Sequence, residues 1–114
     1  MMTEENTETY NGWKNYPTWA VNMWLSNDQG TYNETRERVR EVLEQDHPTS
    51  EYWSLAESKR FNTADMLKDF VEDLAHEEYD KASMLSDLIG YALGEVDWEE
   101  IASHWVRDEE ESGA

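Results

Sequence analysis

The sequence contains no cysteine, only two prolines and five glycines, and no long run of apolar residues. The absence of cysteine excludes a disulfide framework, a zinc–thiolate site and a cysteine nucleophile. The longest apolar runs are two or three residues, so no segment resembles a membrane span or the core of a signal peptide. We therefore expect a cytoplasmic protein with no membrane partner.

Positive charge is also scarce. The chain has 9 Lys and Arg residues against 27 Asp and Glu, a formal net charge of -18. A field of this sign disfavours contact with a nucleic-acid backbone, so we expect no direct nucleic-acid partner. The charge alone would suggest disorder, but 6 Trp, 6 Tyr and 2 Phe residues can bury enough apolar surface for a folded domain. A length of 114 residues suits one domain.

Helical periodicity dominates the chain, and it predicts an all-α fold of five or six short helices around one aromatic-rich core. We expect a disordered lead-in over 1–9, a single helical domain over 10–107 and an acidic flexible tail over 108–114. The first three predicted helices cover about 17–27, about 31–46 and a short stretch around 52–56. A longer helix starts at Asn62 or Thr63, and the last helix runs to about Arg107. Between these two, a further helix carries an apolar face that consists of Leu85, Leu88, Ile89, Ala92 and Leu93.

The start of the last predicted helix has two recognisable signals. Asp97 followed three residues later by Glu100 resembles a capping box, in which each residue caps the other's backbone. Val96 and Ile101 flank it in the positions of a hydrophobic staple. Both signals predict that this helix begins at Asp97.

The stretch from Asn11 to Asp28 holds a Trp, then Asn-Tyr-x-Thr-Trp, then a short amphipathic helix that ends in Asn-Asp. It resembles a signature of small uncharacterised proteins of phages, archaeal viruses and their hosts. The segment from Val96 to Ala102 is similar to the closing helix of the same family. Pro17 stands where we expect an acidic residue. The resemblance implies no reaction, cofactor or catalytic residue, because that family is a domain of unknown function.

The Asn-Tyr-x-Thr-Trp segment has a structural and a functional interpretation. In the structural one, Asn15 and Thr18 brace the first helix, and three rings fill the core. These rings are Tyr16, Trp19 and Trp24. In the functional one, rings of the motif face a partner protein or a stacked ring, because Trp and Tyr dominate interface hot spots. The candidate partner-binding residues are Trp13, Asn15, Tyr16, Thr18 and Trp19.

No residue pattern points to catalysis. His76 begins a pattern close to that of zinc proteases, but Asp80 replaces the second histidine. Two Glu–His pairs lack the Glu-x-x-His spacing of di-iron sites. They are Glu72 with His76 and Glu100 with His104. The five glycines are isolated, so no phosphate-binding loop is present. We expect no enzyme, no metal and no cofactor.

The charge itself has three interpretations: adaptation to a high-salt cytoplasm, mimicry of DNA, or an ordinary acidic surface. In molar salt the Debye length falls to about 3 Å, so repulsion between exposed carboxylates largely disappears. A DNA mimic needs carboxylates in rows on one face. The candidate acidic face consists of Asp65, Asp69, Glu72, Asp73, Glu77, Glu78 and Asp80.

These observations lead to one main hypothesis and one alternative. The main hypothesis is a small acidic accessory protein of viral or mobile-element type, adapted to high salt, that binds an unknown protein partner through an aromatic face. The alternative is an acidic DNA mimic that inhibits a host DNA-binding protein or defence nuclease. A homodimer is left open, because no heptad repeat specifies one.

Overall fold

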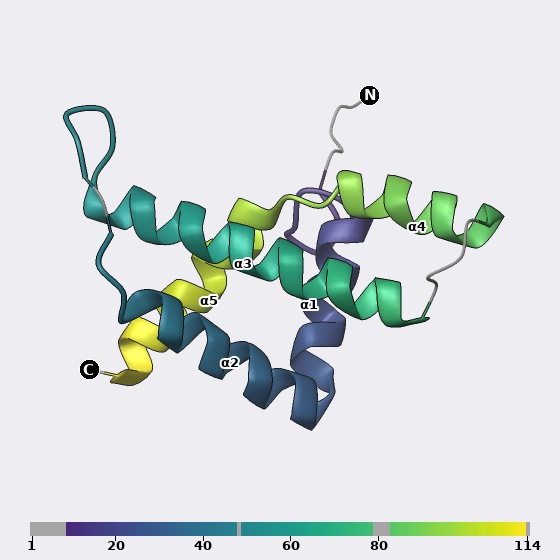
Figure 1. Ribbon diagram of the computed structural model, residues 1–114, viewed down its shortest axis with the longest axis horizontal. Helices are drawn as coiled ribbons and strands as arrows, with labels where there is room; N and C mark the ends of the chain where they lie inside the picture. The colour runs from purple at the N-terminus through teal and green to yellow at the C-terminus, as the bar shows by residue number, and fades with distance from the viewer. Residues whose placement is uncertain (1–8, 48, 79–82, 114) are drawn as a thin grey trace.

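The computed structural model describes residues 9–47, 49–78 and 83–113, and within them the regular structure is helical (Figure 1). The helices are α1 (Tyr16–Asn27), α2 (Gln29–Leu43), α3 (Leu55–Glu78), α4 (Met84–Gly94) and α5 (Trp98–Gly113). The all-α prediction is thus confirmed. The predicted lead-in lies, apart from residue 9, outside the described residues.

The first two helices follow each other almost without a break. Asn15 caps α1 by accepting a hydrogen bond from the backbone N–H of Thr18, and Pro17 occupies the first turn as predicted. Asp28 ends α1 and caps α2, because its carboxylate accepts hydrogen bonds from the N–H (2.9 Å) and the hydroxyl (2.8 Å) of Thr31. These bonds favour the ionised form and lower the pKa of Asp28. This cap is therefore present at neutral pH and is lost as the pH falls through that lowered pKa.

The prediction of two helices between residues 49 and 78 is wrong. A single helix, α3, runs for 24 residues. Ser54 and Glu57 form a capping box at its start: Ser54 N–H donates to the Glu57 carboxylate (2.8 Å), and Glu57 N–H donates to the Ser54 hydroxyl (3.2 Å). Thr63, which we expected at a helix start, is fully buried inside α3. The Ser-x-x-Glu signal at 54–57 was present in the sequence and marks the true boundary.

The predicted end of the last helix near Arg107 is also wrong, since α5 continues to Gly113. The reason is Glu109, whose side chain is only 9% exposed and lies against α2. Its carboxylate accepts hydrogen bonds from Arg36 (3.0 Å) and Arg40 (3.2 Å), and the ion pair raises the pKa of Arg36. An acidic sequence that looks like a solvated tail is thus held as helix by cations from another element.

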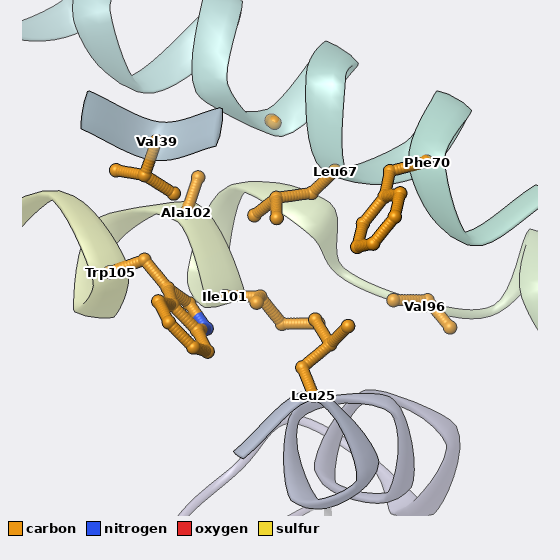
Figure 2. Close-up of a cluster of buried hydrophobic side chains, with 9 residues drawn as sticks. Leu25, Val39, Leu67, Phe70, Val96, Ile101, Ala102 and Trp105 are labelled. Atoms are coloured by element: carbon orange, nitrogen blue, oxygen red, sulfur yellow. The ribbon is translucent and has the colours of Figure 1, made fainter. Parts of the chain in front are cut away.

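The core lies where α2, α3 and α5 meet and α1 contributes one leucine (Figure 2). Two of its buried residues carry aromatic rings, and the others are aliphatic. Val96 and Ile101, the predicted staple, both belong to it. The cluster consists of Leu25, Val39, Ala64, Leu67, Phe70, Val96, Ile101, Ala102 and Trp105.

Helix α4 is the element least integrated into this core. Its predicted position is confirmed, but it contains no buried residue. Two leucines of the predicted apolar face, Leu85 and Leu88, are 52% and 57% exposed and therefore do not belong to the core. The apolar face exists, but no described element covers all of it.

Candidate functional site

A tight turn precedes α1 and sets the position of Tyr10. The backbones of Tyr10 and Trp13 pair in both directions (N···O 2.6 and 2.8 Å). Between them, Asn11 and Gly12 both have positive φ, at 50° and 87°. Positive φ at both central residues is the requirement of a type I′ turn, for which Asn-Gly is the preferred sequence.

Three rings pack against one another at the start of α1. The centroid of Tyr10 lies 5.1 Å from that of Tyr16 and 5.0 Å from that of Trp19, and the last two are 5.6 Å apart. The edge-on and tilted orientations are those that the ring quadrupoles favour. Tyr10 and Tyr16 remain 40% and 55% exposed. Our sequence interpretation missed Tyr10, although the Asn-Gly turn signal predicts its pairing with Trp13.

The outer side of α1 continues this cluster along the helix. Tyr16, Trp19, Met23 and Trp24 stand at positions i, i+3, i+7 and i+8, which share one side of a helix. Trp24 is 67% exposed, while Trp19 and Met23 are half-buried. The structural interpretation is therefore wrong for Tyr16 and Trp24, which do not fill the core. We define the aromatic face by its five members, Tyr10, Tyr16, Trp19, Met23 and Trp24.

The aromatic face coincides with the least acidic part of the chain. Residues 9–27 contain no Asp or Glu and a single cation, Lys14, in a protein with 27 acidic residues. Depletion of charge together with enrichment in Trp, Tyr and Met is the composition of an interface centre.

Trp13, the first predicted partner-binding residue, lies apart from the ring cluster. It is half-buried against the core. Its ring stacks on His104 of α5, with centroids 4.4 Å apart at an angle of 38°. The structure therefore joins Trp13 to α5, and it does not bring this ring to Tyr16 and Trp19.

Asn15 and Thr18 lie beneath the aromatic face and connect α1 to the start of α5. The Asn15 amide oxygen accepts from the Thr18 hydroxyl (2.6 Å), and the Asn15 amide nitrogen donates to the Glu95 carbonyl (2.8 Å). Thr18 is fully buried, and its hydroxyl accepts from the backbone N–H of Asp97 (2.9 Å). Both residues therefore have the bracing contacts that the structural interpretation expects.

The predicted capping box of α5 is half right. The Asp97 carboxylate accepts from the N–H of Glu100 (3.1 Å), as predicted. The Glu100 carboxylate instead accepts from the backbone N–H of Lys14 (2.9 Å). The starts of α1 and α5 are thus joined by hydrogen bonds in both directions, from Lys14 N–H to Glu100 and from Asp97 N–H to Thr18.

We expect Thr18→Val to lower the free energy of unfolding by about 1–3 kcal/mol, because it leaves the N–H of Asp97 buried without its acceptor. Thr18→Ser keeps the hydroxyl and should cost less. Thr49→Val, at an exposed loop position, is the control and should have little effect. Urea unfolding followed by circular dichroism measures all three. Equal stabilities of Thr18→Val and the wild type would contradict the bracing role.

The other candidate residues lie on α3 or outside the described chain. Four carboxylates stand at i, i+4, i+7 and i+8 on one side of α3, which we call the acidic row. These are Asp65, Asp69, Glu72 and Asp73. Glu77 is exposed nearby, whereas Asp80 and the side chain of Glu78 lie outside the described residues.

Two further properties concern the described part of the chain only. It contains no group of three or more His, Asp or Glu side chains positioned to hold a metal ion. None of its helices combines the length and the apolar character that crossing a membrane requires. In the second Glu–His pair, the Glu100 carboxylate accepts from the backbone N–H of Lys14, and the His104 ring accepts from the guanidinium of Arg107 (3.0 Å).

Fold and site together define a small, strongly acidic, all-helical protein with one nearly charge-free aromatic face. The chain belongs to a family of unknown function, DUF7249, whose sequence model matches residues 6–110. No curated protein matches the chain, and no solved structure matches it either.

Proposed function

We propose that this protein is a small accessory protein, of viral or mobile-element type and adapted to high salt, that acts by binding another protein through the aromatic face of α1. The observation that carries the proposal is the exposure of Tyr16 and Trp24 on one side of a helix without carboxylates. Large exposed rings in such a setting are typical binding hot spots.

The salt adaptation and the aromatic face support each other physically. Attraction between opposite charges on two protein surfaces is screened within about 3 Å in molar salt. Burial of apolar rings is not screened, and many salts strengthen it. A protein that works in concentrated salt therefore binds most reliably through a surface such as the aromatic face.

A pull-down in concentrated KCl tests the proposal, with wild type compared to the Tyr16→Ser, Trp24→Ser pair. Both side chains are exposed, so we expect the pair to fold normally and to lose the bound partner. The double variant Tyr52→Ser, Tyr91→Ser loses two other exposed rings and should retain the bound partner. A partner that binds both pairs as well as the wild type would contradict the aromatic-face proposal.

The acidic row keeps the DNA mimic as the second candidate. Four carboxylates within nine residues on one side of α3 are an arrangement that a basic DNA-binding surface can recognise. This candidate predicts that the protein competes with DNA for a basic protein and that competition weakens as salt rises. Competition that is unchanged between low and high salt would contradict it.

A further inference from the structure

Helices α3 and α4 lie side by side (Figure 1), but they are separated by a gap of about 250 Å³. The gap is lined by Glu72, Ala75 and His76 of α3 and by Ser86, Ile89, Gly90 and Leu93 of α4.

The lining combines an apolar wall with a few polar groups, of which one is a carboxylate. Ile89 and Leu93 supply the aliphatic side, and Glu72 supplies the acidic group beside the imidazole of His76 and the hydroxyl of Ser86. Gly90 also lines the gap, and a Cβ atom added to it would meet no atom within 4 Å, so there is open space for a larger side chain at this position. These surroundings match an aliphatic chain that ends in a cation, which is the chemistry of a lysine or arginine side chain.

Negative charge on α3 beside the gap also favours a cationic ligand. Asp69, Glu72 and Asp73 stand at positions i, i+3 and i+4, so they share one side of α3. None of the acidic row forms an ion pair with another described residue. The paired cations lie elsewhere, on α2 and the start of α3. They are Arg36, Arg38, Arg40, Lys59 and Arg60.

We propose that the gap between α3 and α4 binds a lysine or arginine side chain of a cationic segment in a partner protein. The aliphatic stem packs on Ile89 and Leu93, and the charged group pairs with Glu72. The acidic row, from Asp65 to Asp73, extends about 12 Å along α3, so several cations in series on one chain complement it. This site goes beyond the aromatic face and uses a separate surface.

Calorimetric titration of the full chain with a helical Lys/Leu peptide of about 14 residues, or about 21 Å, tests this site. We expect Gly90→Leu to weaken binding at least tenfold, because it fills the gap. Its melting temperature should be unchanged or higher, since leucine favours a helix more than glycine does. Gly94→Leu, also on α4 and with open space at its Cβ, lies outside the gap and should bind like the wild type.

Both glycine variants keep the net charge of -18, so they separate the gap from general attraction of cations. Glu72→Gln should weaken the peptide several-fold, and a Glu/Leu peptide should not bind. Equal affinity of Gly90→Leu and wild type would overturn the proposal, as would equal losses in the two glycine variants. Displacement of the peptide by spermidine at equal concentration would assign the gap to a free polyamine and overturn the assignment to a protein segment.

Discussion

Replacing Leu67 by alanine should lower the free energy of unfolding by about 2–5 kcal/mol, the usual cost of truncating a fully buried leucine. Leu67 has no exposed surface and lies between α3 and α5 in the core (Figure 2). A loss of this size removes a large part of the stability of a small domain. Thermal and urea unfolding by circular dichroism measure it.

Leu88→Ala is the matched control, because it makes the same chemical change at a leucine that is 57% exposed on α4. We expect a change of about 0.5 kcal/mol or less. A large loss at Leu88 would mean that α4 is packed into the core, which contradicts the structure. A small loss at Leu67 would contradict the position of the core itself.

The melting temperature should rise strongly with salt. Between about 0.1 M and about 3 M KCl the Debye length falls from about 10 Å to less than 3 Å, so the mutual repulsion of carboxylates in a chain of net charge -18 is removed. We expect a gain of about 10 °C, which corresponds to roughly 2 kcal/mol for a domain of this size. Part of this gain is general strengthening of apolar burial, so a neutral protein of similar size is measured beside it.

A variant with fewer charges separates the two contributions within the chain. A triple variant lacks three exposed carboxylates of the acidic row, through the substitutions Asp65→Asn, Asp69→Asn and Asp73→Asn. We expect it to melt higher than the wild type in dilute buffer and at the same temperature in concentrated salt. If wild type and variant respond equally to salt, or if the wild type gains no more than the neutral protein, the high-salt interpretation is wrong.

The helices themselves could be predicted from the sequence, because caps and apolar spacing are local properties. Asn15 with Pro17, and Asp97 with Glu100, marked two helix starts correctly. The boundary of α3 was missed because Thr63 and Ser54 are both good caps, and the local sequence does not say which one is used. The end of α5 depends on Arg36 and Arg40 of another helix, which no local pattern reveals.

The candidate site could be predicted only in part, for the same reason. The density of rings between residues 13 and 24 indicated a special segment, but not which rings face the solvent. Trp24 and Leu25 are neighbours in sequence, yet one is 67% exposed and the other is in the core. Which side of α1 is covered is set by α2 and α5, and therefore by tertiary packing.

The central claim is that the aromatic face of α1 contacts a partner protein. Photo-crosslinking tests it most directly, with benzoylphenylalanine placed at Trp24 or, as a control, at Glu37, which is exposed on α2. In concentrated KCl, we expect a discrete crosslinked partner from position 24 and none from position 37. No crosslink at position 24, or the same products from both positions, would contradict the claim.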